Sequence, residues 1–165
     1  MYNLILMRHG DSPRAFGGDE QRELSTKGRS ETKITADYIK SHYIIDHILC
    51  SSSIRTRQTL EVLKNTTKTN ASIEFSDDIY KNDFTILQNL VEQSSDSSKT
   101  ILLLGHNPSL LAFALQCDSS GYDTWSQEIS EGMQTAEIIV IEFETLTWTD
   151  AIRSGGKIRD IFIPL

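Results

Sequence analysis

The chain of 165 residues carries a formal net charge of −7, with 38% hydrophobic and 24% charged residues. These values are typical of one globular domain, predicted over residues 1–165, rather than of a disordered chain. The acidic balance argues against nucleic acid or an anionic membrane surface as a partner, and every apolar run is far shorter than the roughly 20 residues that cross a bilayer.

Apolar runs and turn signals predict an alternation of strands and helices along the chain. Strands are expected at Tyr2–Met7, Asp46–Cys50, Ile73–Phe75, Thr100–Gly105 and Ala136–Phe143, with a short sixth one around Ile158–Ile163. Helical spacing occurs in Thr26–Ser41, Ser53–Asn65 and Asp83–Gln93, and again in the segment NPSLLAFALQ. This order indicates an α/β fold with a central, mainly parallel mixed sheet flanked by helices on both faces.

Local signals refine the ends of these elements. Ser25 or Thr26 is expected to cap the first helix, in which Ile34 and Tyr38 share a face. In NPSLLAFALQ, Asn107 is the expected N-cap and the following proline occupies the first helical position. The C-terminal third differs, because TAEIIVIEFETLTWTD predicts a strand, a turn and a hairpin.

Three predicted strands lead into residues suited to binding and chemistry. The run LMRHG ends in Arg8 and His9, LLLGH ends in His106, and CSSSIRTRQT leads into a helix with Arg55 in its first turn. Since parallel strands end at the same edge of a sheet, neighbouring strands would bring these four side chains into one pocket. Arg57, two residues further on, would point elsewhere on the helix.

This set of residues favours a phosphoryl group as the ligand. Arginine binds such a group through two parallel hydrogen bonds. Helix starts after Ser51 and Asn107 would present N–H groups to the same anion, so both residues are predicted to contribute to substrate binding. A neutral imidazole can attack phosphorus in line while the arginines stabilise charge on the equatorial oxygens. Such chemistry requires neither a metal nor a cofactor.

Four motifs in order, LMRHGDS, RELSTKG, SSSIRTRQT and LLLGHNPSL, together resemble the histidine phosphatase superfamily, also called phosphoglycerate mutase-like. The short length and the ending are similar to the compact SixA-type phosphohistidine phosphatases. The resemblance implies a mixed sheet flanked by helices, with His9 as the phosphorylated nucleophile. It implies further that Arg8 and Arg55 bind phosphate, that His106 is the second imidazole of the pocket, and that Arg22 lies at its rim.

The chain departs from the family pattern at two places. Ser51-Ser52 stands where the family usually has Ser-Pro, which predicts a looser turn before Arg55. Larger members carry an acidic general acid, whereas the matching segment SDDIYKNDF offers only Asp78 and Asp83 as candidates. Because an imidazole leaves phosphorus more readily than an alkoxide does, the missing acid favours phosphohistidine over sugar phosphates.

The sequence therefore predicts a metal-independent phosphatase that acts through a covalent phosphohistidine intermediate and removes phosphate from phosphohistidine on a protein. The alternatives are a phosphatase of a small phosphorylated metabolite and a phosphoprotein-binding module with negligible turnover. A metallohydrolase using His9, Asp11 and His106 is disfavoured, because no metal-ligand spacing is present and two arginines would repel a cation.

The remaining polar and aromatic residues are expected to be structural. Two distant cysteines, predicted to stay reduced, and the absence of a signal peptide indicate a cytoplasmic protein. Trp125 and Trp148 are expected to pack rather than to contact substrate, and neither His42 nor His47 belongs to a site motif.

Overall fold

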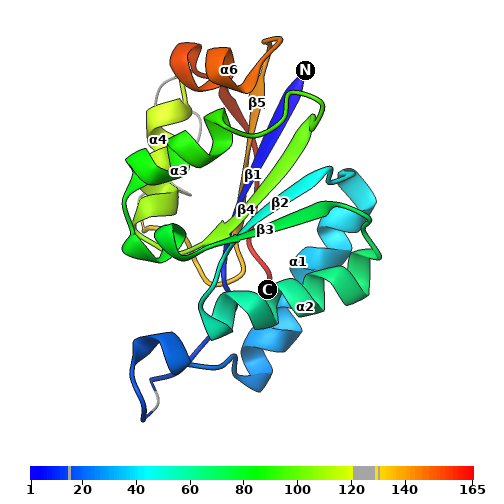
Figure 1. Ribbon diagram of the computed structural model, residues 1–165. Helices are drawn as coiled ribbons and strands as arrows, with labels where there is room; N and C mark the ends of the chain where they lie inside the picture. Colours follow the sequence, from blue (N-terminus) through cyan, green and yellow to red (C-terminus); the bar gives the residue numbers. More distant parts are fainter. Residues whose placement is uncertain (15, 121–128, 130) are drawn as a thin grey trace.

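A computed structural model describes residues 1–14, 16–120, 129 and 131–165 of the chain (Figure 1). Within these residues, six strands form one sheet in the order β3-β2-β4-β1-β5-β6. The strands are β1 (Tyr2–Arg8), β2 (His47–Ser51), β3 (Ser72–Ser76), β4 (Thr100–Gly105), β5 (Ile138–Phe143) and β6 (Lys157–Phe162). Five of them overlap the predicted main strands, and β6 overlaps the predicted short one.

The sheet is mixed but mainly parallel, which confirms the predicted fold class. Strands β1, β2, β3 and β4 pair in parallel, whereas β5 runs antiparallel to both β1 and β6. Strand β4 lies between β1 and β2, and its register with β1 places Gly105 beside Arg8. The residues that follow these two strands therefore emerge side by side at the carboxyl edge of the sheet.

Helices cover both faces of the sheet (Figure 1). Helices α1 (Thr26–His42) and α2 (Ile54–Thr67) pack on one face, and α3 (Phe84–Glu92), α4 (Ser109–Cys117) and α6 (Trp148–Ser154) pack on the other. Two short 3₁₀ helices, η1 (Asp19–Gln21) and η2 (Asp77–Lys81), follow β1 and β3. No helix in the described part of the chain is both long and apolar enough to span a membrane.

The two faces of the sheet carry separate hydrophobic clusters. Along β1, Leu4 and Leu6 belong to the cluster beneath α3, α4 and α6, whereas Ile5 and Met7 belong to the cluster beneath α1 and α2. All four side chains are fully buried. A strand covered on both faces reads as one continuous apolar run, which is why the sequence shows no alternation here.

The face of α1 that carries Ile34 and Tyr38 is not its buried face. Ser25 caps this helix by accepting a hydrogen bond from the Gly28 N–H, as one of the two alternatives had it. Ile34, however, is 41% exposed, and the helix instead buries Thr32, Thr35 and Ala36 against the sheet. Small side chains on this face, together with the buried Ile39, allow the helix to pack closely on its neighbours.

The expected start of α4 is also wrong. The helix begins at Ser109, so Pro108 occupies the N-cap position and Asn107 lies outside the helix. The Ser109 N–H donates instead to the Asn82 Oδ1 at 3.0 Å, so the first N–H is not free for an anion. The cap is supplied by a residue 27 positions earlier, which no local pattern could indicate.

The C-terminal strands pair antiparallel, but their connection contains α6 instead of a simple turn. Thr147 caps this helix, with its side chain accepting from the Asp150 N–H. Trp148 is fully buried in the core, as predicted. The expectation for Trp125 falls outside the described residues.

Candidate active site

A tight turn after β1 presents His9 at the carboxyl edge of the sheet. The His9 ring nitrogen Nδ1 lies 2.7 Å from the Gly10 carbonyl oxygen. Because a carbonyl only accepts hydrogen bonds, Nδ1 carries the proton, and the Nε2 lone pair on the other side of the ring accepts a hydrogen bond from the Arg55 Nε. The Gly10 N–H donates to the Thr59 Oγ1 at 3.1 Å, which ties this turn to α2.

Close backbone contacts explain the glycines of two of the motifs. A Cβ on Gly10 would lie 2.6 Å from the Gly28 carbonyl oxygen, and a Cβ on Gly28 would lie 2.2 Å from the Asp11 carbonyl oxygen. Ser25 adds a hydrogen bond from its Oγ to the Asp11 Oδ2 at 2.6 Å. The segment LSTKG therefore packs directly against RHGDS and helps to orient His9.

Arg55 joins the two imidazoles. Its Nε lies 3.3 Å from the His9 Nε2, and its Nη2 lies 3.3 Å from the His106 Nδ1. The centroids of the two imidazole rings are 5.4 Å apart. Three distant parts of the sequence thus meet as predicted, because β1 and β4 are neighbours and α2 begins just after β2.

Burial keeps both imidazoles neutral. His9 and His106 are 6% and 5% exposed. Desolvation, assisted by the positive charge of Arg55, lowers the pKa of His9 to about 4 and that of His106 to about 3. At neutral pH the His9 Nε2 is therefore unprotonated and faces a cationic surrounding, as a nucleophile toward an anionic phosphoryl group requires.

The segment before β5 holds Arg8 in place through hydrogen bonds. The Arg8 Nη1 donates to the Met133 carbonyl at 2.7 Å, and the Arg8 backbone N–H donates to the Glu137 carbonyl at 3.1 Å. Glu137 is only 1% exposed, and burial raises its pKa to about 7 although the charge of Arg8 opposes that rise. Sequence reasoning treated this segment only as a strand and missed its part in the site.

Asp19 and Tyr80 are further members of the site that the motifs did not indicate. The Asp19 Oδ2 accepts from the Arg55 Nη2 at 3.1 Å and from the Tyr80 hydroxyl, and its Oδ1 accepts from the Arg22 Nη1 at 2.9 Å. These hydrogen bonds hold the pKa of the Asp19 carboxyl well below its usual range. Arg22, predicted at the rim, is thus paired with an acid in its own loop.

Together these residues line a pocket of about 360 Å³, called here the carboxyl-edge pocket. Its lining consists of Arg8, His9, Asp19, Arg22, Arg55, Tyr80, Asn82, His106 and Asn107. Among the described residues, the buried side-chain polar atoms without a hydrogen-bond partner are the Arg8 Nε and the Asn107 Oδ1. Both residues belong to this lining, so the pocket contains one donor and one acceptor that the protein itself leaves without a partner.

Comparison with known proteins agrees with this geometry. The family model described as histidine phosphatase superfamily (branch 1) matches residues 4–100, which is more than half of the chain. The chain belongs to the histidine phosphatase superfamily. This membership supports a phosphatase activity.

Relatives of this histidine phosphatase include proteins of SixA type. Phosphohistidine phosphatase SixA of Escherichia coli is 36% identical over 59 residues, which cover 35% of this chain and 37% of that protein. An uncharacterized protein of Mycobacterium leprae is 28% identical over 142 residues, covering 82% of this chain and 86% of its own length.

Solved structures share the fold over nearly the whole chain. A candidate phosphohistidine phosphatase SixA from Nakamurella multipartitia superposes with a TM-score of 0.85 at 23% identity, covering 99% of this chain and 96% of its own. The protein histidine phosphatase SixA complexed with tungstate superposes with a TM-score of 0.78 at 20% identity, covering 98% and 97%. The histidine phosphatase fold is therefore SixA-like.

Two predicted substrate-binding residues of this histidine phosphatase lie in different surroundings. Ser51 is fully buried behind His106, where its Oγ lies 2.8 Å from the His106 Nε2, and it is not part of the pocket lining. We therefore expect it to position His106 rather than to contact substrate. Asn107 does line the pocket, and its Nδ2 donates to the Met133 carbonyl at 3.1 Å.

The turn before Arg55 is not loose. The Ser52 Oγ donates to the Asp77 carboxylate, and the Arg57 Nε donates to the Ser52 carbonyl at 2.9 Å. Hydrogen bonds thus replace the restriction that a proline would impose. Arg57 lies over the ring of Phe75, 4.1 Å from its centroid, and so points away from the pocket as predicted.

Neither candidate general acid reaches the carboxyl-edge pocket. Asp78 pairs with Lys81 at 2.6 Å on η2. Asp83 caps α3 by accepting from the Thr85 N–H, and this bonding lowers the pKa of its carboxyl. Among the described residues no group of three or more His, Cys, Asp or Glu side chains could hold a metal ion.

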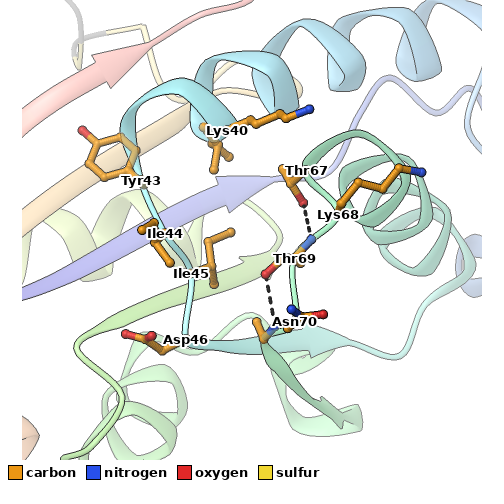
Figure 2. A pocket seen from close by; sticks show the side chains of 11 residues that line it. Lys40, Tyr43, Ile44, Ile45, Asp46, Thr67, Lys68, Thr69 and Asn70 are labelled. Carbon is orange, nitrogen blue, oxygen red and sulfur yellow. Dashed lines mark hydrogen bonds between the residues drawn. The ribbon is translucent and has the colours of Figure 1, made fainter.

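A second hollow, of about 430 Å³, lies at the opposite edge of the sheet, where the chain enters β2 and β3. Figure 2 shows the side chains that line it. This amino-edge hollow is lined by residues 39–40, 43–46 and 67–71. Its hydroxyls are already paired within the protein: the Thr67 Oγ1 donates to the Leu63 carbonyl, the Thr69 Oγ1 accepts from the Ala71 N–H at 3.1 Å, and the Tyr43 hydroxyl donates to the Asp160 carboxylate at 2.7 Å. The larger of the two cavities therefore contains no predicted site residue and no group poised for chemistry.

Proposed function

We propose that the protein is a phosphatase that removes phosphate from phosphohistidine on a protein, through a covalent intermediate on His9. The observation that carries this proposal is the orientation of His9: the Gly10 carbonyl holds Nδ1 at 2.7 Å, while Nε2 lies 3.3 Å from the Arg55 Nε. A neutral, oriented imidazole in a cationic pocket is suited to attack an anionic phosphoryl group.

In the proposed first step, the Arg55 Nε releases the His9 Nε2. The Nε2 lone pair then forms a bond to phosphorus while the bond to the leaving group breaks and its electron pair goes to that group. Arg8 and Arg55 would hold the equatorial oxygens, whose charge they stabilise in the loose transition state. His106 would be the second imidazole of the pocket, held by Ser51. Arg22 and Asn107 would bind substrate at the rim. Water would then hydrolyse the phosphohistidine without a metal.

The proposed substrate follows from the lack of a suitable proton donor among the acidic residues near the pocket. An alkoxide leaving group needs a proton donor, yet the acid in the described pocket lining, Asp19, has a pKa held well below its usual range. Asp78 and Asp83 lie outside the lining. An imidazole can leave without such a donor. The solved protein histidine phosphatase SixA complexed with tungstate, an oxyanion like phosphate, supports a phosphoryl-binding pocket in this fold.

Exposure of the rim supports a protein-borne substrate. The side chains of Asp19 and Arg22 are 50% and 23% exposed, while His9 and Arg55 at the floor are almost covered. A phosphorylated side chain could therefore enter from solvent. We also propose a cytoplasmic location, which the free, buried Cys50 and Cys117 support.

The test is phosphate release from a phosphohistidine peptide with a chelator present, comparing the native chain with His9→Ala. His42→Ala is the matched control, because His42 is exposed and far from the pocket lining. We expect turnover and an acid-labile phosphoenzyme in the native protein and in His42→Ala, and neither in His9→Ala. Peptide binding without turnover would indicate a phosphoprotein-binding module, and turnover of a phosphorylated metabolite alone would contradict the proposed substrate.

A further inference from the structure

Asp19 occupies the position in the carboxyl-edge pocket where an anion would be expected to bind. The guanidinium of Arg55 donates from Nη1 to the Asp19 carbonyl at 2.9 Å and from Nη2 to the Asp19 Oδ2 at 3.1 Å. These are the two parallel donors that would grip a phosphoryl group. A phosphoryl group that binds through this pair of donors would replace Asp19 on them.

Once displaced, the carboxylate would still lie at the mouth of the pocket. Two contacts independent of Arg55 hold it there: the Arg22 Nη1 donates to its Oδ1 at 2.9 Å, and the Tyr80 hydroxyl donates to its Oδ2. Its side chain is 50% exposed, whereas that of Arg55 is 6% exposed. The group attached to phosphorus has to extend from the covered floor toward solvent, and this path passes Asp19.

We propose that Asp19 determines specificity by selecting leaving groups that carry a proton on a ring nitrogen, above all the protonated imidazole of phosphohistidine, and by repelling acidic ones. The inference rests on the proposed function and names the residue that sets its substrate class. Asp19 is the acid among the described residues that line the pocket, and it contacts two arginines of the same lining, Arg22 and Arg55.

The chemistry balances without proton transfer to Asp19. The protonated ring nitrogen of the substrate donates a hydrogen bond to the carboxylate. The His9 Nε2 then bonds to phosphorus, and the electron pair of the breaking P–N bond goes to the other ring nitrogen. A neutral imidazole leaves with its proton, so no general acid is consumed. A phosphate ester that carries a free carboxylate, such as a phosphoglycerate, would instead place that negative charge close to the Asp19 carboxylate.

The experiment measures kcat/KM for a phosphohistidine peptide and for a phosphoglycerate in the native protein and in Asp19→Asn. Asparagine keeps the shape but removes the charge. We expect the ratio of the two kcat/KM values to fall on the order of 10-fold to 100-fold, as loss of one charge-assisted hydrogen bond implies. Most of the loss should be in kcat for the phosphohistidine peptide.

Glu20→Gln is the matched control, because Glu20 is the adjacent exposed acid and lies outside the pocket lining. It should leave the ratio unchanged. If Asp19→Asn changes both activities in parallel, Asp19 only orients Arg55 and Arg22, and the inference is overturned while the proposed function stands. If the native protein turns over neither substrate and forms no phosphoenzyme, both are overturned.

Discussion

The carboxyl-edge pocket and the amino-edge hollow open at opposite ends of the same sheet, and the hollow is the larger of the two. In the hollow, side chains such as Thr67 and Thr69 satisfy nearby backbone groups. In the pocket, Arg55 links the two imidazoles, while the Arg8 Nε and the Asn107 Oδ1 remain unpaired. The ability of a cavity to bind and convert a ligand therefore depends on its unpaired polar groups rather than on its volume.

The largest expected effect in this comparison is a loss of kcat/KM at Arg55 that the neighbouring Arg57 on the same helix should not show. Arg55→Lys should lower kcat/KM on the order of 100-fold, because an ammonium cannot supply the paired donors of the guanidinium. Arg57→Lys is its matched control, since Arg57 lies over Phe75 outside the pocket, and it should retain activity within about twofold. Steady-state kinetics on a phosphohistidine peptide would decide, and equal losses in both variants would contradict the assignment of Arg55.

The buried acid beside Arg8 predicts a pH-dependent stability. Burial raises the pKa of Glu137 to about 7, so between its ordinary pKa and 7 the folded state binds more protons than the unfolded state. Through this group, the free energy of unfolding of the native protein therefore falls as pH rises through that window. Glu137→Gln should gain stability relative to the native protein between pH 5 and pH 8, on the order of 2 kcal/mol.

Urea unfolding at both pH values measures this difference. Glu144→Gln is the control, because Glu144 is exposed and should show the same stability change with pH as the native chain. An unchanged difference between native protein and Glu137→Gln across the window would contradict the expected burial of the charge.

A smaller effect on kcat should follow when His106, the second imidazole, loses its contact with Ser51. Ser51→Ala removes the hydroxyl that lies 2.8 Å from the His106 Nε2, and kcat should fall about 10-fold with little change in KM. Ser72→Ala removes a similar serine–imidazole contact, to His47 at 2.6 Å, at the amino end of β3 and should leave kcat unchanged. A rise in KM alone would instead place Ser51 in substrate binding.

The smallest expected effect tests the hollow. Thr69→Ala removes the acceptor of the Ala71 N–H and should lower the free energy of unfolding by about 1 kcal/mol, with kcat/KM unchanged within twofold. Thermal unfolding and kinetics on the same preparation measure both quantities. A selective loss of activity at unchanged stability would show that the amino-edge hollow takes part in the function.

Much of the fold and part of the site could be read from the sequence, because they depend on local patterns. The strand Thr100–Gly105 was predicted to its last residue, since a doubly covered strand is apolar throughout and ends at a glycine. Arg8 ends a strand, His9 and His106 follow strands, and Arg55 lies in the first turn of a helix. The parallel topology brings such positions together. Four motifs in order also indicated the superfamily, which the family model confirmed.

Only the tertiary structure decided which other groups complete the site. Asp19 and Tyr80 are 61 positions apart, and Glu137 reaches Arg8 only because β5 pairs with β1. Asn82, which directly follows η2, takes the place of Asn107 in accepting from the first N–H of α4. Burial, and with it the neutral state of both imidazoles, depends on contacts between distant segments. A sequence specifies periodicity and turns locally, whereas partners and desolvation arise from packing between segments far apart in the chain.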